Sequence, residues 1–229
     1  MPAPLVVAEV FGPTVQGEGP SAGRLAAFVR LGRCNLACAW CDEPHTWDWS
    51  RYDPGVELSH RPTGDVLAQL DGIGAPLLVV TGGEPLLQQP RLVPLLQGAK
   101  QRGWEVEVET SGTIAPTLAD GLVDRYNVSP KLASSGNPRE RRYVPEVLRS
   151  FRDSGRAVFK FVVAEAGELD EVAEMVDECG LADVWVMPEG TEADVVAARL
   201  RRLAPHVIAR GWNLTSRLHV MIWGDRRGV

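Results

Sequence analysis

The sequence predicts an α/β fold in which about six core parallel strands form an open, partial barrel with fewer helices than a full barrel. Two observations lead to this class. Short runs rich in β-branched residues alternate with amphipathic runs, and this alternation favours parallel strands joined by crossover helices. The strand-like runs are also too few to close a complete α/β barrel.

Strands are expected where a short apolar run stands beside turn residues. These segments are 25–32, 77–80, 104–110, 125–129, 158–164, 184–187 and 219–223. Helices are expected between most of them. Segments 89–103 and 168–180 carry apolar side chains on one helical face and end in glycine, as helices often do.

Composition limits the class of protein. The chain has 229 residues, of which 45% are hydrophobic, so residues 1–229 are expected to form a single domain around one core. A net charge of −6 argues against a nucleic-acid surface, which needs clustered Lys and Arg. The apolar runs are too short to cross a membrane and the first residues do not resemble a signal peptide, so a cytoplasmic protein is expected.

Four unusual loops follow four successive expected strands. CNLACAWC (34–41) follows the first, TGGEP (81–85) the second, TSGT (110–113) the third and SPK (129–131) the fourth. The carboxyl ends of parallel strands lie on one rim of an α/β barrel and carry its active site. The four loops are therefore expected to build one composite pocket.

The cysteines predict a metal centre. Cys34, Cys38 and Cys41 have C-x3-C-x2-C spacing, and Cys179, in a predicted helix, is expected to be buried as a small apolar residue. A tight, odd-numbered group in a reducing cytosol indicates metal binding rather than disulfides. Three thiolates on an iron–sulfur cube leave one iron open for a ligand. A zinc site with His45 as its fourth ligand is the alternative.

The cysteine spacing resembles that of the radical S-adenosylmethionine (SAM) superfamily. The resemblance implies a partial barrel of the radical SAM type and a [4Fe–4S] cluster on Cys34, Cys38 and Cys41. The open iron would bind SAM, and reduction of the cluster would cleave SAM to a 5′-deoxyadenosyl radical. The implied SAM-binding residues are Trp40, Gly82, Gly83, Glu84, Ser129, Pro130 and Lys131. The alternatives are an ordinary turn at the two glycines, a packed side chain at Trp40 and a solvated side chain at Lys131.

Blocks along nearly the whole chain resemble, in order, the family of 7-carboxy-7-deazaguanine synthases. They are QGEG (16–19), FVRLGRCNLACAWCD (28–42), VVTGGEPLLQ (79–88), VETSGT (108–113), SPKLASSG (129–136), FKFVV (159–163), VMPEG (186–190) and RLHVMIWGDRRGV (217–229). The resemblance implies a radical SAM lyase of 7-deazapurine (queuosine-type) biosynthesis. Its substrate would be 6-carboxy-5,6,7,8-tetrahydropterin, which loses the hydrogen at C6 before ring contraction and release of ammonia.

The same resemblance implies a set of substrate-binding residues. They are Gln16, Gly17, Glu18, Arg30, Thr81, His219 and the terminal carboxylate of Val229. A pterin edge is rich in donors and needs amide or carboxylate acceptors, whereas its carboxylate needs a guanidinium. Arg30 lies in an otherwise apolar strand, so it is expected to face a buried anion. A core position in a strand is the alternative for His219.

One position departs from the family. After the third cysteine the family has Asp-Thr, then proline and an aromatic residue, where this chain has Asp42, Glu43, Pro44 and His45. The family threonine helps to hold Mg2+. Glu43 offers a hard oxygen ligand for that ion, but it could instead repel the substrate carboxylate, and both interpretations stay open.

Two other function classes compete with the lyase. A diverged radical SAM enzyme, such as an activase or a peptide modifier, would act on a protein partner and often has extra cysteines. A non-catalytic iron–sulfur or zinc module would not need the other matched loops. The family resemblance also implies a homodimer and an external electron donor such as flavodoxin or ferredoxin.

Overall fold

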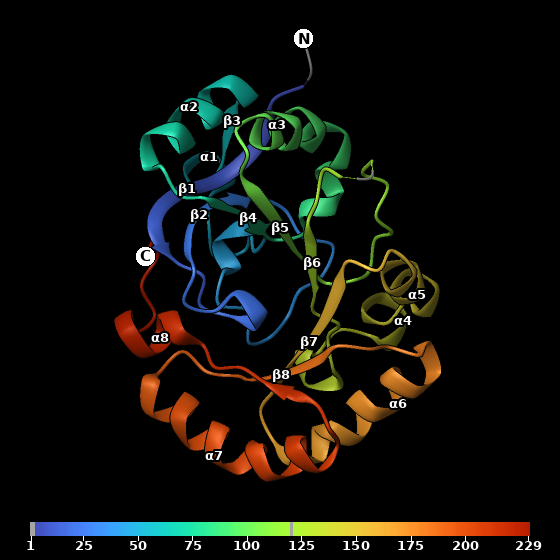
Figure 1. The fold of residues 1–229 in the computed structure, drawn as a ribbon. Helices are drawn as coiled ribbons and strands as arrows, with labels where there is room; N and C mark the ends of the chain where they lie inside the picture. Colours follow the sequence, from blue (N-terminus) through green and yellow to red (C-terminus); the bar gives the residue numbers. More distant parts are fainter. Residues whose placement is uncertain (1–2, 120) are drawn as a thin grey trace.

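A computed structural model describes residues 3–119 and 121–229. The strands are β1 (Leu5–Val15), β2 (Leu25–Leu31), β3 (Ser59–Arg61), β4 (Leu77–Gly82), β5 (Glu105–Thr110), β6 (Arg125–Val128), β7 (Ala157–Val163), β8 (Val184–Pro188) and β9 (Asn213–Leu214). They form one sheet in the order β3-β1-β2-β4-β5-β6-β7-β8-β9 (Figure 1). Neighbours from β2 to β9 pair in parallel, whereas β1 and β3 add an antiparallel edge.

Helices cover the outer side of this curved sheet. They are α1 (Pro54–Glu57), α2 (Thr63–Ile73), α3 (Gln89–Gln101), α4 (Arg139–Arg142), α5 (Pro145–Asp153), α6 (Leu169–Cys179), α7 (Ala193–Ala209) and α8 (Leu218–Trp223). Figure 1 shows α3, α5, α6 and α7 along the outside of the strands. None of the described helices is long and apolar enough to cross a membrane.

The core lies between the strands and these outer helices. Leu78 and Val80 of β4 and Leu92 and Leu95 of α3 are at most 1% exposed. Parallel strands covered by crossover helices are buried on both faces, which is why β4 is an unbroken apolar run. Burial of each such side chain contributes about 1.5–3 kcal/mol, so this layer is a main source of stability.

The open barrel predicted from the sequence is confirmed. β3 and β9 stand at the two ends of the sheet, and the part of the chain that the structure describes shows no pairing between them. The first six expected strands correspond to β2, β4, β5, β6, β7 and β8. The expected helices correspond to α3 and α6, and Cys179 at the end of α6 is fully buried, as predicted.

The expected strand at 219–223 is wrong, because these residues lie in α8. A short apolar run does not distinguish a strand from a helix, and this one was too short for periodicity to decide. In the structure Val220 is 3% exposed, whereas Met221 and Ile222 are 44% and 52% exposed. This pattern is that of a short helix with one buried face.

β1, an eleven-residue strand that pairs with β2 in antiparallel fashion, was not predicted from the sequence. Gly12 and Pro13 interrupt its apolar pattern, and turn residues of this kind argue against a strand. The structure accommodates them in a register shift between Phe11 and Thr14. This strand brings Glu9 beside Arg30, which matters for the site.

Candidate active site

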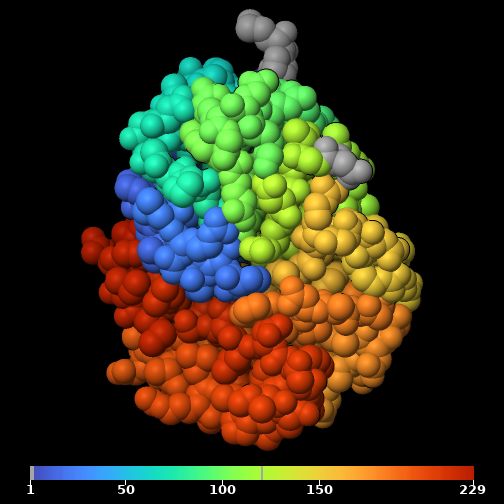
Figure 2. All heavy atoms as spheres, in the orientation of Figure 1, coloured from blue at the N-terminus to red at the C-terminus, as the bar shows by residue number. Residues whose placement is uncertain are grey.

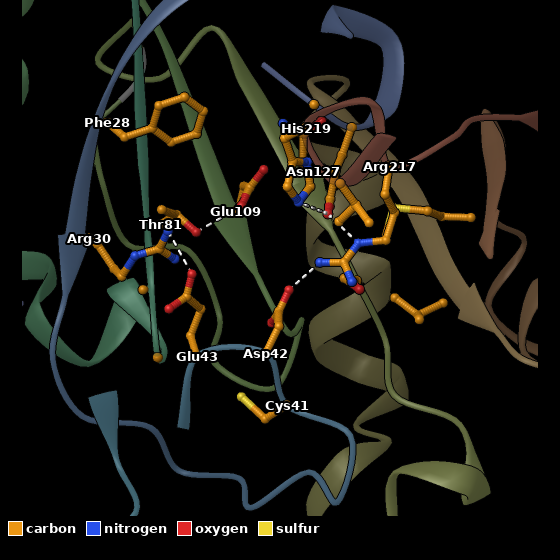
Figure 3. Close-up of a pocket in the computed structure, with 18 of the residues that line it drawn as sticks. Phe28, Arg30, Cys41, Asp42, Glu43, Thr81, Glu109, Asn127, Arg217 and His219 are labelled. Atoms are coloured by element: carbon orange, nitrogen blue, oxygen red, sulfur yellow. Dashed lines mark hydrogen bonds and ion pairs between the residues drawn. The ribbon is translucent and has the colours of Figure 1, made fainter. Parts of the chain in front are cut away.

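The four unusual loops meet in one pocket at the carboxyl ends of β2, β4, β5 and β6 (Figure 3). The segment between β1 and β2 and the last residues of the chain complete its wall. Figure 2 shows this N-terminal region in blue packed against the C-terminal region in red. The composite pocket expected from the loop positions is therefore present, and it joins both ends of the chain.

Nearly all the residues selected from the sequence line this pocket. They are Gln16, Gly17, Glu18, Arg30, Cys34, Cys38, Trp40, Cys41, Glu43, Thr81, Gly82, Gly83, Ser129, Lys131, His219 and Val229. Glu84 and Pro130 do not line it. Sequence reasoning missed several charged and polar lining residues, which are Asp42, Glu109, Asn127, Lys160, Glu189 and Arg217.

Glu84 belongs to the scaffold behind the pocket. It is fully buried, and its carboxylate accepts hydrogen bonds from the Leu86 backbone N–H (3.0 Å) and the Thr110 hydroxyl (2.9 Å). It also accepts from the backbone N–H and the hydroxyl of Ser111, at 2.8 and 2.6 Å. A buried carboxylate needs such partners. The Glu84 side chain thus ties the end of β4 to the end of β5.

The two glycines after β4 bring that turn against the cysteine loop. A Cβ on Gly82 would lie 2.1 Å from the Leu31 carbonyl oxygen, and one on Gly83 would lie 2.1 Å from the Arg33 carbonyl oxygen. The Gly83 N–H donates to the Leu31 oxygen at 3.0 Å. Only glycine permits so close a backbone approach. The turn therefore fixes the chain that leads into Cys34.

The three cysteines of the predicted metal centre are free thiols on this pocket. Burial raises the pKa of Cys34 to about 12 and also raises the pKa of Cys41. The thiols of Cys34 and Cys41 are therefore protonated at neutral pH until a metal displaces the protons, which couples metal binding to proton release.

The structure does not place His45 with the cysteines. Its side chain is 3% exposed, and its Nδ1 lies 3.3 Å from Oε2 of Glu43. Among the described residues, the potential metal-binding group that contains His45 includes Glu9 and Glu43 but no cysteine. A zinc site of three cysteines and His45 therefore finds no support in this geometry.

Charged side chains from several segments of the chain form a network on the pocket wall. The Glu18 carboxylate pairs with Lys160 and, at 3.2 Å, with Nε of Arg217, which also pairs with Asp42. Burial raises the pKa of Glu18, but the attraction of Lys160 and Arg217 outweighs burial, so the pKa lies below its ordinary value. Glu18 is therefore ionised at neutral pH. A charge within an apolar strand, as at Lys160, is the signal that could have revealed this network from the sequence.

Gly17 makes room for His219. A Cβ at Gly17 would lie 2.0 Å from Nδ1 of His219, and the Leu218 N–H donates to the Gly17 carbonyl at 2.8 Å. His219 thus enters the pocket from α8 and not from a strand, with Nε2 3.9 Å from Glu18. Burial lowers the pKa of His219 despite the opposing effect of Glu18, so the imidazole is neutral at neutral pH.

Glu109 links two of the predicted substrate residues. It accepts from the Gln16 amide at 3.1 Å and from the Thr81 hydroxyl at 2.7 Å. The Gln16 carbonyl oxygen accepts the Glu18 N–H at 3.2 Å, which orients the Gln16 amide. The pocket therefore presents carboxylate and hydroxyl oxygens from three separate segments of the chain, those of Glu18, Thr81 and Glu109, which we call the acceptor row.

Arg30 does face buried anions, but they belong to the chain itself. Its Nε lies 2.9 Å from Oε2 of Glu9, and its Nη2 lies 2.7 Å from Oε1 of Glu43 (Figure 3). Burial raises the pKa of Glu43 to about 7, although the Arg30 charge acts in the opposite direction. Oε2 of Glu43 is buried without a hydrogen-bond partner among the described residues.

The last residues reach the pocket because Arg227 anchors them. The Arg227 guanidinium pairs with Glu9 at 3.3 Å and with Glu57 at 2.9 Å. This places Val229 on the pocket wall.

Known proteins match this chain over most of its length. A model of the Radical SAM superfamily matches residues 29–179. The 7-carboxy-7-deazaguanine synthase of Pyrobaculum aerophilum is 38% identical and covers 97% of this chain and 96% of its own length. That of Rhodopirellula baltica is 32% identical over 98% of this chain and 89% of its own length. The crystal structure of QueE from Escherichia coli has a TM-score of 0.73 at 26% identity, over 94% of this chain and 95% of that chain.

The open barrel and its three-cysteine pocket thus define a radical SAM enzyme. Within that superfamily, the chain belongs to the family of 7-carboxy-7-deazaguanine synthases. SuiB from Streptococcus suis shares only the fold, with a TM-score of 0.56 at 13% identity over 84% of this chain and 49% of its own.

Proposed function

We propose that this protein is a radical SAM lyase that converts 6-carboxy-5,6,7,8-tetrahydropterin to 7-carboxy-7-deazaguanine with loss of ammonia. The observation that carries the proposal is the pocket, which the three cysteines, the acceptor row and Arg30 line together. The near full-length similarity to proteins of this name supports it.

Cys34, Cys38 and Cys41 would hold a [4Fe–4S] cluster. Within residues 3–119 and 121–229 the only other cysteine is Cys179, buried in α6, so three sulfurs and no fourth line the pocket. This donor set fits a cube with one iron open to SAM. When bound, the cluster supplies the electron that cleaves SAM.

Trp40, Ser129 and Lys131 would hold SAM beside the cysteines. The Lys131 ammonium lies 5.5 Å from the centre of the Trp40 ring and donates to the Ser129 hydroxyl at 3.0 Å. An aromatic face for the adenine, a hydroxyl for the ribose and a cation for the carboxylate match the chemistry of SAM. Gly82 and Gly83 would let the backbone approach SAM closely. Glu84 and Pro130 would support the two loops that bind it.

The substrate would lie between the proposed SAM-binding residues and the wall that carries Glu18 and Glu109. Gln16, Glu18 and Thr81 would bind the pterin edge, with Gly17 making room for neutral His219 to hydrogen-bond as well. Arg30 would neutralise the substrate carboxylate, and Val229 would close the pocket. A buried, charge-assisted contact of this kind contributes about 1.5–3 kcal/mol.

Mg2+ binding at Glu43 is also proposed. Its Oε2 accepts no hydrogen bond from the described residues, although Nδ1 of His45 lies 3.3 Å away, so it can accept a hard cation. One potential ligand atom each from Glu9, Glu43 and His45 lies within 4.8 Å of the others. A cation on Glu43 would take over the charge compensation that Arg30 now provides. Arg30 would then be free for the substrate carboxylate.

Several broader features complete the proposal. Residues 1–229 would form one domain, since one sheet runs from the first strand to the last. The enzyme would act in the cytoplasm, where its four free cysteines stay reduced. It would work as a homodimer and take electrons from an external donor such as flavodoxin or ferredoxin, as the family resemblance implies.

The test is anaerobic reconstitution with iron and sulfide, followed by incubation with SAM, dithionite and 6-carboxytetrahydropterin. Mass spectrometry should detect 7-carboxy-7-deazaguanine together with 5′-deoxyadenosine. A loaded protein that releases 5′-deoxyadenosine but never forms the deazaguanine would be a radical SAM enzyme with another substrate.

A further inference from the structure

Each of the three pocket cysteines accepts a hydrogen bond from an N–H group. The Leu36 backbone N–H donates to Sγ of Cys34 at 3.4 Å. The Asn137 side-chain Nδ2 donates to Sγ of Cys38 at 3.3 Å, and the Trp47 indole Nε1 donates to Sγ of Cys41 at 3.3 Å. Two of the three donors are side chains that lie outside the cysteine motif, and neither was selected from the sequence.

Asn137 is fixed so that its amide nitrogen must face the sulfur. It is 8% exposed, and its Oδ1 accepts the Ala37 backbone N–H at 2.9 Å. That N–H requires an acceptor, so the amide cannot be turned around. The neighbouring Ser135 carbonyl accepts the Ala39 N–H at 2.9 Å. The segment around Asn137 therefore holds both the backbone and one sulfur of the cysteine loop.

Trp47 is fixed from the other side of the loop. Its backbone N–H donates to the Pro44 carbonyl at 3.1 Å, and the preceding Thr46 carbonyl accepts the Arg33 N–H at 2.6 Å. These bonds join the chain on both sides of the cysteine motif. An indole N–H is a donor only, so its contact with Cys41 can serve only to stabilise charge on that sulfur.

We propose that Trp47 and Asn137 set the reduction potential of the cluster by donating N–H groups to the Cys41 and Cys38 sulfurs. Reduction adds one electron from an external one-electron reductant and takes [4Fe–4S]2+ to [4Fe–4S]+, and no bond forms or breaks. The added negative charge is shared by iron and sulfur, so an N–H donor stabilises the reduced form more than the oxidised form. Both residues therefore raise the potential.

This inference rests on the cluster of the proposed function but not on the pterin substrate. The surroundings contain two carboxylates. That of Asp42 adjoins Cys41 in sequence and is paired with Arg217, and that of Glu84 is buried near Cys34 without a cationic partner among its hydrogen bonds. Negative charge near a cluster opposes the uptake of an electron. N–H groups that contact the sulfurs counteract this effect. A solvent-exposed cation would do so less well, because water and salt screen its charge.

The experiment is an EPR-monitored redox titration of the reconstituted protein with dithionite, in the absence of SAM and substrate. Trp47→Phe removes the N–H and keeps the ring. Asn137→Asp keeps the acceptor for Ala37 and removes the donor. Trp185→Phe is the matched control, because its indole N–H donates to Oδ1 of Asp183 at 2.8 Å and not to a sulfur.

Trp47→Phe should lower the equilibrium constant for reduction about tenfold, which is about 59 mV for one electron. Asn137→Asp should lower this constant at least as far, because the substitution also adds a negative charge. Trp185→Phe should leave the constant unchanged. If the fully loaded Trp47→Phe protein has the same reduction potential as the unmutated protein, the inference is overturned. So does loss of the cluster in both variants, which would make the two residues structural. If the unmutated protein itself holds no cluster, the proposed function fails as well.

Discussion

Arg30 is held between two carboxylates of its own chain, although its role as proposed is to bind a carboxylate of the substrate. Glu9 and Glu43 lie 2.9 and 2.7 Å from the guanidinium, whose side chain is 12% exposed. A buried guanidinium without an anion would be costly, so these partners keep Arg30 in place when no substrate is bound. On the proposed function, substrate or metal binding would rearrange this group.

The first prediction concerns Arg30. Arg30→Ala should raise the dissociation constant of the pterin by about 10- to 100-fold, because one charge-assisted contact is lost. SAM affinity should hardly change. Equilibrium binding to the reconstituted protein measures the dissociation constants of the pterin and of SAM. Arg24→Ala is the control, since Arg24 is exposed just before β2 and pairs with Glu105 of β5. An equal loss of SAM affinity would place Arg30 in the cofactor site or the scaffold.

The second prediction concerns Glu43. If its carboxylate is a productive Mg2+ ligand, the protein should reach half-maximal turnover at about tenfold less Mg2+ than Glu43→Thr does, because a formal charge strengthens a hard-cation site. Turnover against Mg2+ concentration for both proteins decides this. Glu192→Thr, at an exposed position outside the pocket, should behave like the unmutated enzyme. Higher activity of the threonine variant at every Mg2+ concentration would show instead that Glu43 repels the substrate.

At the scale of elements, the turn after β4 supports the cysteine loop. Gly82 and Gly83 touch the backbone of residues 31–33, and Glu84 locks the same turn to the end of β5. The GGEP motif therefore carries a packing role beside the proposed contact with SAM. Two neighbouring parallel strands are needed to position one metal-binding loop.

The third prediction tests this support. Gly83→Ala would place a Cβ 2.1 Å from the Arg33 carbonyl oxygen and 3.0 Å from Cβ of Cys34, and backbone atoms cannot yield as a flexible side chain can. The variant should lose about 1–3 kcal/mol of unfolding free energy and bind substoichiometric iron. Gly64→Ala is the control, because a Cβ there meets nothing within 4 Å. Iron content and thermal unfolding measure the difference, and a Gly83→Ala protein with full iron would remove the packing role.

At the scale of the whole molecule, ion pairs join the two ends of the chain to the middle. Glu18 comes from the segment between β1 and β2, Lys160 from β7 and Arg217 from the turn before α8. Because these charges are buried, each depends on its partners for compensation. The network therefore closes the pocket wall where the open barrel has no further strand.

The fourth prediction follows from the lowered pKa of Glu18. A carboxyl group whose pKa is lower in the folded than in the unfolded protein contributes stability above its unfolded pKa, here 4.5, and loses it as the pH falls. Glu18→Gln should therefore cost about 3 kcal/mol at pH 7, and each pH unit below 4.5 should remove about 1.4 kcal/mol of that difference.

Urea unfolding of the metal-free protein between pH 7 and acid pH measures this difference. Glu105→Gln is the control, because it breaks the exposed pair with Arg24 and should cost less than about 1 kcal/mol. A Glu18→Gln difference that stays constant down to pH 3.5 would show that Glu18 does not titrate as a buried ion pair. The assignment of Glu18 as an ionised acceptor would then need revision.

The sequence by itself determined the fold class, the position of the pocket and the three cysteines that are proposed to bind the metal. These follow from local patterns: the apolar run of β4, the glycines that end helices, and the fixed spacing of Cys34, Cys38 and Cys41. Parallel strands put their carboxyl ends on one rim, so loop position alone placed distant motifs together.

Only the tertiary structure decided which charges meet. Strand register and the entry of α8 into the pocket decide the pairing. The pairs are Glu9 with Arg30, Glu18 with Lys160, and Trp47 with Cys41. Short segments such as 219–223 are ambiguous because local periodicity does not determine their state, and packing against the β1–β2 segment does. Long-range electrostatic and hydrogen-bond partners carry no local signature, so the fine chemistry of this site emerges only when the chain is folded.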